Sequence, residues 1–309
     1  MSVQIRMRIL ISGASGFVGE NLRRTLQDAG HQVWHLVRRQ TESEQERRWD
    51  IRSGVIDLRV DDAFDAVIHL AGASIADRRW SKSVKQELLE SRILSTTLLA
   101  QTIADMKTPP KTFISASAIG IYGAQPEGPV TETSPHGDDF LAELCERWED
   151  SAQVAKDAGI RVVHPRLSVV LGRGGGMLQR VMPLFENRFG GRLGNGAQWF
   201  SWIALSDLLR AFLFILDTPS IVGPVNMSAP NCVTNQAFTK ALQQVLSVSC
   251  GIPAPAAALK LAFGREMAEQ TMLASQRVIP EVLVNAGFVF EFGALEDALA
   301  HELAALQTR

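Results

Sequence analysis

Near the N-terminus, three glycines spaced three residues apart separate a strand-like segment from a helix-like one. The apolar run MRILIS (7–12) leads directly into GASGFVG (13–19), after which Val18, Leu22 and Leu26 recur every four residues. That spacing is typical of one face of an amphipathic helix. A strand, a glycine-rich turn and a helix in this order form a site where free N–H groups and a partial positive charge at the helix start bind phosphate.

Each glycine of this loop meets a separate physical requirement. Gly13 permits a tight turn, Gly16 leaves room for a diphosphate to approach the backbone, and Gly19 lets helix and strand pack closely. The alternative is a glycine-rich turn without a ligand, but the strand before the loop and the helix after it favour the phosphate site. The residues expected to line a bound dinucleotide are Gly13, Ser15, Gly16, Phe17, Val18 and Gly19.

The end of the next expected strand indicates which dinucleotide suits the loop. Proteins that bind NAD normally end this strand with an acidic residue that holds the ribose 2′-hydroxyl. Here the strand 31–37 ends at Val37, and Arg38 and Arg39 follow. A guanidinium makes charge-assisted bonds to phosphate, each worth about 1.5–3 kcal/mol, or roughly ten- to a hundredfold in affinity. The pattern predicts NADP, and the alternative is two surface arginines.

Strand-like and helix-like segments alternate through the first half of the chain. Further strands are expected at 64–72, 111–117 and 160–172, and helices at 81–106 and 141–158. This alternation predicts an α/β fold with a doubly wound, parallel Rossmann sheet. After residue 172 the sequence becomes rich in glycine and arginine, and a helix at 205–216 and a strand at 223–228 then return to the sheet.

We therefore expect the chain to divide into two parts. Residues 7–172 would form a dinucleotide-binding domain, to which residues 202–230 return. Residues 173–201 and 231–309 would form a smaller, mostly helical substrate lobe. Near the C-terminus, alternating phenylalanines predict one face of a short strand, at Phe288, Phe290 and Phe292.

Composition argues against several other classes of protein. A net charge of −2 gives no reason to expect nucleic acid or an anionic membrane as a partner. The most apolar later run, 208–216, is too short to span a bilayer. Without a signal-peptide pattern either, the chain is expected to be cytoplasmic. The cysteines Cys145, Cys232 and Cys250 lack CxxC spacing, so reduced thiols and no metal site are expected.

Eight further or overlapping segments, spread over almost the whole chain, are informative when taken together. They are GASGFVG (13–19), HLAGASIADRRW (69–80), SRILSTTLLA (91–100), SASAIGIYG (115–123), FLAELCERWE (140–149), PRLSVVLGRGGGML (165–178), WFSWIALSDL (199–208) and QRVIPEVLVNAGF (276–288). These segments resemble extended, atypical members of the short-chain dehydrogenase/reductase superfamily, and within it the chain is most similar to the SDR39U1-like nucleoside-diphosphate-sugar epimerase family. The resemblance implies NADP binding and the C-terminal domain of unknown function typical of that family.

The resemblance also implies further cofactor contacts. Leu70, Ala71 and Gly72 would end a strand under the cofactor and pass its adenosine or ribose. Arg92 stands where relatives carry an asparagine, and with Glu87 on the same helix it is expected to reach the edge of the cofactor. The alternative for the last two residues is a solvated pair on the helix surface.

The chain contains one tyrosine, and it is out of place for proton transfer. Tyr122 lies in SASAIGIYG, which reads like SSxxVYG in relatives, where this tyrosine is structural or faces the substrate. The catalytic Tyr-x-x-x-Lys pair of relatives belongs further on, in the helix with FLAELCERWE. There Leu144 and Trp148 take the two positions, or Cys145 and Glu149 in a register shifted by one. The pair is missing in both registers, and losing a positioned acid or base typically costs about 10²–10⁴ in rate.

Other groups are candidates for the missing role. Ser117 aligns with the superfamily's active-site serine, with Ser115 and Ala118 as the neighbouring registers; the alternative is a buried serine bonded to its own strand. A Glu149 carboxyl of raised pKa could transfer a proton, as could Cys145. The simpler interpretation is that Cys145 packs within the fold and Glu149 faces solvent.

Arginines and aromatic residues gather on the expected substrate side. Arg166 ends the sixth expected strand, where family members bring cofactor and sugar nucleotide together, and Ser115 is placed with it on the cofactor side. Guanidinium groups bind phosphates and aromatic rings stack on bases or sugars. The residues expected to face a nucleotide-like substrate are Tyr122, Arg173, Arg188, Arg192, Trp199 and Trp202. The alternative is a glycine-rich loop whose aromatic residues fill the interface between the lobes.

These features predict an NADP-binding oxidoreductase or epimerase-like protein that acts on a small polar substrate such as a nucleotide sugar. The alternative is a non-catalytic NADP(H)-binding sensor or regulatory protein, which the missing Tyr-x-x-x-Lys pair favours. The helix 141–158 is where relatives often form homodimers, but its apolar face could equally pack on its own sheet.

Overall fold

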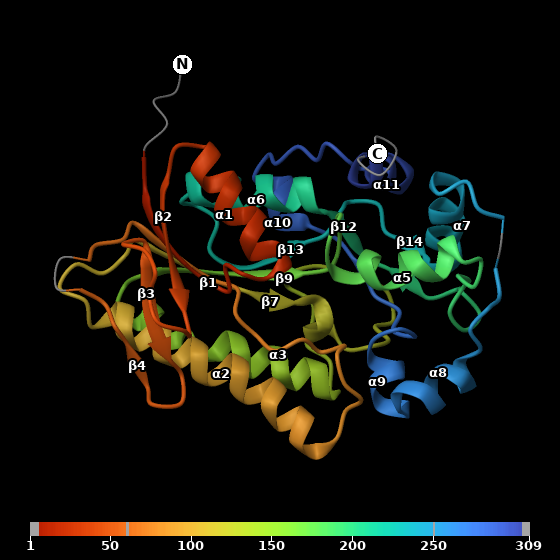
Figure 1. The fold of residues 1–309 in the computed structure, drawn as a ribbon, viewed down its shortest axis with the longest axis horizontal. Helices are drawn as coiled ribbons and strands as arrows, with labels where there is room; N and C mark the ends of the chain where they lie inside the picture. The colour runs from red at the N-terminus through yellow and green to blue at the C-terminus, as the bar shows by residue number, and fades with distance from the viewer. Residues whose placement is uncertain (1–5, 60–61, 250, 305–309) are drawn as a thin grey trace.

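The computed structural model describes residues 6–59, 62–249 and 251–304. A parallel sheet with the strand order β13-β9-β6-β5-β1-β2-β3 forms the centre, and β4 extends one edge in the antiparallel direction (Figure 1). The short strand β7 pairs with β9 outside this path. The strands are β1 (Arg8–Ser12), β2 (Gln32–Val37), β3 (Glu46–Asp50), β4 (Val55–Ile56), β5 (Ala66–His69), β6 (Thr112–Ser115), β7 (Ser117–Ala118), β9 (Arg161–Leu167) and β13 (Gly223–Met227).

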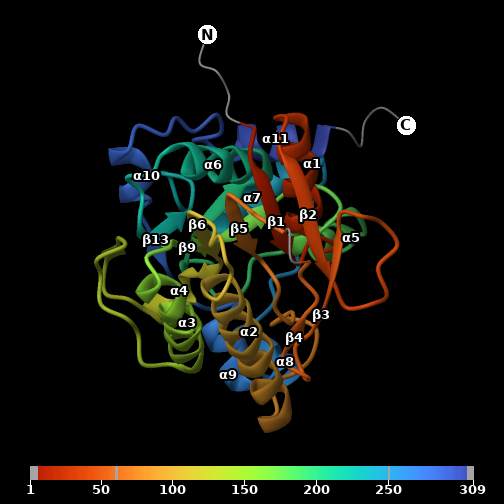
Figure 2. The same ribbon diagram turned by 90° about the vertical axis from the view of Figure 1, so that its left-hand side faces the viewer.

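Helices cover both faces of this sheet (Figures 1 and 2). Alternate side chains of β1 enter two separate cores. Ile9 and Ile11 pack with Leu22 and Phe212 on one face, and Leu10 packs with Leu99 on the other. One face carries α1 (Phe17–Asp28), α6 (Leu205–Asp217) and α10 (Glu281–Asn285), and the other carries α2 (Lys82–Ala104), α3 (Phe140–Asp150) and α4 (Gln153–Asp157).

The remaining elements lie toward one end of the sheet and contribute to two further cores. Leu178, Trp202, Phe238 and Leu299 are buried together in one of them, and Ile121, Val130 and Val278 pack with Leu144 of α3 in the other. The elements are the turn η1 (Ile119–Tyr122), the helices α5 (Gly176–Glu186), α7 (Asn235–Val245), α8 (Ala256–Phe263), α9 (Arg265–Gln270) and α11 (Leu295–Leu303), and the strand pairs β8 (Pro129–Val130) with β15 (Arg277–Val278), β10 (Val169–Leu171) with β12 (Trp202–Ala204), and β11 (Trp199–Phe200) with β14 (Val233–Thr234).

The predicted Rossmann fold is confirmed, and the sheet defines where a ligand binds. The chain leaves β1 for β2 on one side and reaches β5 on the other side. In open parallel sheets, ligands bind at the carboxyl ends of the strands where the strand order reverses in this way. The glycine loop at 13–19 and the residues after β5 therefore border the same crevice.

Three local features differ from the expectations. The helix expected at 141–158 is two helices, because Ser151 ends α3 and its hydroxyl donates to Trp148 O at 2.6 Å. The strand β3 was not expected, since it is highly charged, yet Glu46 and Arg47 are buried. Each has a partner of opposite charge, which is the usual condition for burying an ion.

The phenylalanines near the C-terminus do not form a strand, so that expectation was wrong. Asp207 of α6 is buried, and its carboxylate accepts the backbone N–H groups of Glu291 and Phe292, both at 2.9 Å. The side chain of Asp207 thus takes the place of a neighbouring strand. Phe288 and Phe290 pack against the core below α6.

Two further observations concern the character of the whole chain. Within the described ranges, none of the helices combines the length and the apolar character that a membrane span requires. Cys145 and Cys232 are free thiols, and Cys250 lies outside the described residues.

Candidate functional site

The loop between β1 and α1 has the geometry of a phosphate cradle. Gly13 has φ +73°, and a Cβ added there would lie 2.8 Å from the carbonyl carbon of Leu70 and 2.9 Å from the nitrogen of Ala71. A Cβ at Gly19 would lie 2.1 Å from Gly13 O. Side chains at these positions would therefore push the loop away from the strand and from the start of α1. Gly16 is the N-cap of α1, and no side chain caps this helix, so its first N–H groups are available to an outside acceptor.

Phe17, the first residue of α1, forms a wall of the crevice. A Cβ at Gly175 would lie 2.2 Å from its Cδ2 atom, and one at Gly172 would lie 2.9 Å from its Cζ atom. The glycine-rich stretch before α5 therefore lies directly on the ring. This contact joins the cofactor loop to the start of α5, which the sequence assigned to the substrate lobe.

The two arginines after β2 are in different states. Arg39 donates to both carboxylate oxygens of Glu46, at 2.6 and 3.0 Å. Hydrogen bonds from Arg39 and the Glu42 N–H hold the pKa of the Glu46 carboxyl at about 2. Arg38 is exposed and makes no hydrogen bond or ion pair with the described residues. Of the pair, Arg38 is thus the one left to bind a 2′-phosphate next to Val37, the last residue of β2.

A buried histidine fixes the strand ends beneath the loop. His69 Nδ1 lies 2.5 Å from Ser12 Oγ and its Nε2 lies 3.1 Å from Ser95 Oγ. Burial lowers the pKa of His69 to about 3, so the ring is neutral. Ser95 already donates to Ser91 O at 2.7 Å, so His69 must donate from Nε2, and Ser12 donates to Nδ1. This chain joins β1, β5 and α2 at the edge of the crevice.

Beyond β5, the crevice meets Arg92 of α2. A Cβ on Gly72 would lie 3.3 Å from Arg92 Cζ, so the absence of a side chain at Gly72 lets the guanidinium lie against the backbone. Leu70 and Ala71 touch the glycine loop on the other side, as described above. The structure does not bring Glu87 to Arg92: Glu87 is exposed and forms an ion pair with Arg78. Its expected position at the edge of the cofactor is therefore not supported.

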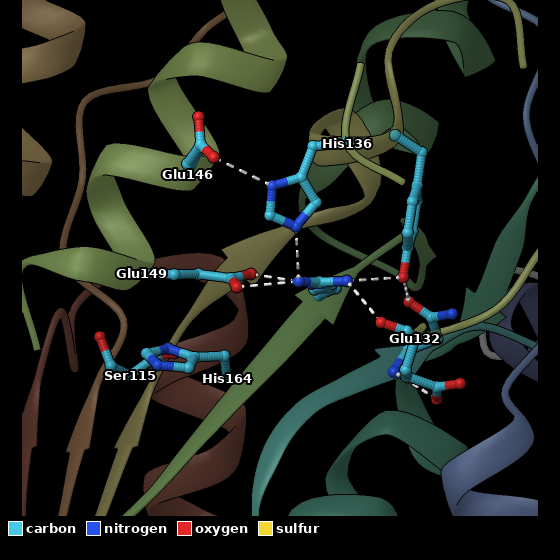
Figure 3. A network of polar contacts seen from close by, with 9 residues as sticks. Ser115, Glu132, His136, Glu146, Glu149 and His164 are labelled. Carbon is cyan, nitrogen blue, oxygen red and sulfur yellow. Dashed lines mark hydrogen bonds and ion pairs between the residues drawn. The ribbon is translucent and has the colours of Figure 1, made fainter. Parts of the chain in front are cut away.

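A second group of polar residues lies at the carboxyl ends of β6, β7 and β9, around Arg166 (Figure 3). Arg166 is buried, and it donates to both oxygens of Glu149, at 2.8 and 2.9 Å. It also donates to the Tyr122 hydroxyl at 3.0 Å and to Glu132 O at 3.2 Å, and its Nη2 lies 3.4 Å from His136 Nε2. The guanidinium is satisfied by the protein itself.

This network extends toward β13 and the C-terminal segment. The Tyr122 hydroxyl donates to Asn226 Oδ1 at 2.6 Å, and the N–H groups of Asn226 and Val282 donate to Glu132 Oε1 at 2.9 and 3.2 Å. Tyr122 is almost completely buried. The expected roles of Arg166 toward the cofactor and of Tyr122 toward the substrate must therefore be corrected, because both groups bind inside the protein.

The structure also removes two candidates for proton transfer. Burial alone would raise the pKa of Glu149, but the hydrogen bonds and charge of Arg166 outweigh burial and hold it below its usual value. Glu149 is therefore an ionised, paired group and not an acid of raised pKa. Burial raises the pKa of the Cys145 thiol to about 12, so it stays protonated. Leu144 and Trp148 are buried, and the Trp148 indole donates to Thr96 Oγ1 at 3.1 Å.

Two buried serines lie at the same strand ends, and they differ in their surroundings. Ser115 Oγ has no hydrogen-bond partner among the described residues. Ser117 pairs with Arg166 in the sheet register, and its hydroxyl faces the Glu149 carboxylate and helps to lower the pKa of that group. His164 Nδ1 donates to Ser115 O at 3.3 Å (Figure 3). Buried hydroxyls without partners can donate to a ligand oxygen.

On the expected substrate side, the expectation that Trp202 faces a ligand is wrong. It has no exposed surface, and its indole donates to Asn231 O at 3.1 Å, so it belongs to the core and cannot stack on a ligand. Arg173 and Arg192 are exposed. Trp199 is partly exposed and stacks under Arg277, whose Cζ lies 4.9 Å from the ring centroid.

A cavity of about 690 Å³ lies next to Trp199, because the adjacent Gln198 and Ser275, whose Oγ accepts from Trp199 N, both line it. Polar side chains and apolar ones line it, at Gln125, Gly194, Asn195, Ala197, Gln198, Pro255, Ala256, Leu273 and Ser275. These residues were not expected from the sequence, because they come from four separate segments and none belongs to a recognisable motif. The glycines around Asn195 were the one local signal. In the described part of the chain, no group of three or more His, Cys, Asp or Glu residues is arranged to hold a metal ion.

Comparison with known proteins gives a consistent result. Residues 9–227 match the NAD dependent epimerase/dehydratase family, and residues 254–302 match a domain of unknown function, DUF1731. An epimerase family protein of Mycobacterium bovis, Mb2239, is 41% identical over 293 residues, which cover 95% of this chain and 96% of the relative. The epimerase family protein YfhF of Bacillus subtilis is 35% identical, with 98% and 100% covered.

A solved structure shares the complete fold. The crystal structure of human epimerase family protein SDR39U1 (isoform 2) with NADPH superimposes with a TM-score of 0.89 at 33% identity. The match covers 96% of this chain and 99% of the human one. The similarity therefore extends across the sheet, the crevice and the C-terminal helices.

Proposed function

Because the chain belongs to the NAD dependent epimerase/dehydratase family, we propose that it binds NADP(H) and acts as an oxidoreductase or epimerase-like protein. The observation that carries the proposal is the loop between β1 and α1, where Gly13 and Gly19 leave no room for side chains beside an uncapped helix start. The related human protein of known structure was solved with NADPH.

Each part of the crevice has a separate task in this proposal. The N–H groups at the start of α1 bind the diphosphate, and Leu70 to Gly72 offer backbone that a ribose can approach. Arg38 binds the 2′-phosphate, since Arg39 is already neutralised by Glu46. When bound, NADP(H) supplies a nicotinamide that accepts or donates hydride. The free hydroxyl of Ser115, and that of Ser117 when it turns away from Glu149, would then donate hydrogen bonds to an oxygen of the substrate.

The substrate we propose is small and polar, and a nucleotide sugar is the leading candidate. The cavity near Gln125, Asn195 and Gln198 offers amide groups that bond to sugar hydroxyls, and exposed Arg192 lies in the same segment and suits a phosphate. The division into a cofactor domain (7–172 with 202–230) and a substrate lobe stays a prediction, as do the cytoplasmic location and the homodimer.

One observation favours a second candidate, an NADP(H)-binding sensor without turnover. Three groups near the strand ends that could have moved a proton are each held in one state: Glu149 is ionised by Arg166, Cys145 is protonated, and the Tyr122 hydroxyl binds Asn226. A sensor needs the cofactor crevice but no acid or base. In this case the cofactor would order the elements around it for a partner.

Calorimetry with purified protein tests the cofactor proposal directly. NADPH is expected to bind at least tenfold more tightly than NADH, and heat from neither would reject the proposal. To separate enzyme from sensor, absorbance at 340 nm is followed with a panel of sugar nucleotides and small carbonyl compounds. Chromatography of the same mixtures detects epimerisation, which causes no net change in absorbance. Turnover in either assay rejects the sensor, and silence in both with NADPH bound rejects the enzyme for those substrates.

A further inference from the structure

Two arginines near the strand ends are buried to different extents and have different kinds of partner. Arg166 has the carboxylate of Glu149 as a partner. Arg92 is partly buried and donates to two carbonyl oxygens, Leu88 O at 3.1 Å and Ala73 O at 2.9 Å. Its Nε is fully buried and has no partner, and no carboxylate of the described residues forms an ion pair with it.

The groups that face Arg92 carry no compensating charge. On the α3 side its Cζ lies 5.0 Å from the Trp148 ring, and the nearby Cys145 thiol is protonated because burial raises its pKa to about 12. Beneath it, His69 is neutral. Burial lowers the pKa of Arg92 itself, which means that the surroundings disfavour its charge. A guanidinium remains charged at neutral pH in spite of this.

An uncompensated cation is costly in a protein interior unless a counter-ion is supplied. Carbonyl dipoles and an aromatic ring offset part of this cost. A full negative charge would offset more, and the residues that the structure describes provide none here. Buried polar groups that lower the stability of a fold are typically found at functional sites.

The position of Arg92 indicates where its counter-ion comes from. The guanidinium lies against Gly72, and the residues just before Gly72 touch the glycine loop at Gly13. Arg92 therefore borders the crevice on the β5 side, opposite to Arg38 at the end of β2. A ligand that lies along the crevice from Arg38 past the start of α1 would next reach Arg92.

We propose that Arg92 binds an anionic oxygen group, a phosphate or a carboxylate, of a small molecule in the crevice. The proposal rests on the proposed function for the position of the crevice ligand. The group belongs either to the dinucleotide itself, as part of its diphosphate, or to a second, anionic substrate beside it. The chemistry is the same for both sources: the anionic oxygen neutralises the guanidinium and accepts a hydrogen bond from the unpaired Nε–H.

Two probes distinguish the sources: NADPH, and inorganic pyrophosphate added to protein saturated with NADPH. The test variant is Arg92→Gln, and the matched control is Arg265→Gln, which removes a mostly exposed arginine of α9. If the dinucleotide is the source, Arg92→Gln weakens NADPH binding about tenfold, the value of one charge-assisted bond. If a substrate is the source, NADPH affinity is unchanged, and pyrophosphate binding falls about tenfold. Unchanged binding of both probes overturns the proposal.

The melting temperature of the ligand-free protein distinguishes a ligand-binding role of Arg92 from a structural one. Arg92→Gln removes an uncompensated charge, so its melting temperature is expected to equal or exceed that of the wild type while ligand binding falls. A lower melting temperature with unchanged binding would assign Arg92 a structural role and overturn the proposal.

Should Arg92→Gln fail to fold, the wild type still decides the question. Phenylglyoxal modifies arginines, and mass spectrometry identifies the modified position. NADPH or pyrophosphate is expected to slow modification of Arg92 at least fivefold without protecting Arg265; equal rates with and without both probes would overturn the proposal. If the wild type binds neither NADPH nor NADH, the proposed function fails, and the pyrophosphate measurement on ligand-free protein still tests Arg92.

Discussion

The guanidinium of Arg166, near the end of β9, binds both carboxylate oxygens of Glu149, in the last turn of α3, at 2.8 and 2.9 Å. The resemblance to short-chain dehydrogenases aligns either Trp148 or, in a register shifted by one, Glu149 with the lysine of their catalytic pair. Here the position holds an anion with a fixed partner. The pair joins α3 to the sheet, and through the Tyr122 hydroxyl and Glu132 O it reaches β13 and the C-terminal segment.

Breaking this pair is expected to destabilise the fold strongly. Glu149→Gln leaves the buried guanidinium of Arg166 without its counter-ion, and such a loss costs about 3–5 kcal/mol. Chemical denaturation followed by circular dichroism measures this free energy of unfolding. Glu146→Gln is the matched control on α3, because Glu146 is exposed and meets only His136; a similar loss in both variants would contradict the prediction.

The same pair predicts a pH dependence. The folded-state pKa of Glu149 lies below its unfolded value, so its contribution is fully present above the unfolded value, about 4.3. It is lost as the pH falls through the lowered folded-state pKa. The gap in unfolding free energy between wild type and Glu149→Gln is therefore expected to be constant from pH 6 to 8 and to narrow in acid. A gap that widens in acid would reverse the assigned charge state.

Arg38 is expected to control the choice between dinucleotides. Arg38→Ala should weaken NADPH binding by about tenfold or more, the value of a charge-assisted bond to the 2′-phosphate. NADH lacks that phosphate, so its affinity should stay the same. Calorimetry with both cofactors checks this, with Arg265→Ala as an exposed control. If Arg38→Ala keeps the wild-type preference, the 2′-phosphate contact has been assigned to the wrong residue.

Gly19 is expected to tolerate no side chain. A Cβ there would lie 2.1 Å from Gly13 O, so Gly19→Ala must displace either the loop or α1. We expect at least a tenfold loss of NADPH affinity, about 1.4 kcal/mol. Gly128→Ala is the control, because a Cβ at Gly128 meets nothing within 4 Å. Equal NADPH affinity in the two variants would show that the cradle does not bind the diphosphate.

Tyr122 is expected to act in the fold and not on the cofactor. Tyr122→Phe removes the hydroxyl that accepts from Arg166 and donates to Asn226, and a buried group left unpaired costs about 1–3 kcal/mol. NADPH affinity should be unchanged. Thermal unfolding and calorimetry on the same preparation separate the two effects, and a large loss of affinity at unchanged stability would place Tyr122 in the crevice.

The local sequence was sufficient to predict the sheet and the cofactor loop. The repeat of Val18, Leu22 and Leu26 predicted α1, and the positive φ of Gly13 and the close contact of Gly19 with Gly13 O are properties of the loop backbone itself. Both depend on contiguous residues, which is why the pattern is visible in one chain. The strand β3 was missed for the opposite reason, since its charged residues are buried only through distant partners.

Within the candidate site, the sequence indicated which residue types to expect but not which partners those residues have. The sequence did not distinguish Arg38 from Arg39. In the structure Glu46, seven positions after Arg39, forms an ion pair with Arg39 and, among the described residues, leaves Arg38 free. Trp202 read as a ligand-facing ring and is a core residue. Periodicity and motifs describe how a segment folds, but they carry no information about which side chain a distant segment covers or neutralises.

The sequence alone determined the parallel sheet, the glycine cradle and the absence of a Tyr-x-x-x-Lys pair, because each depends on residues that are close in sequence. The tertiary structure determined which charged groups have a partner of opposite charge. It gave Arg166 a counter-ion from α3 and, among the described residues, none to Arg92, although both arginines lie near the same strand ends. The physical reason is that burial and electrostatic pairing depend on distance in space, and the chain brings residues together that lie far apart in sequence.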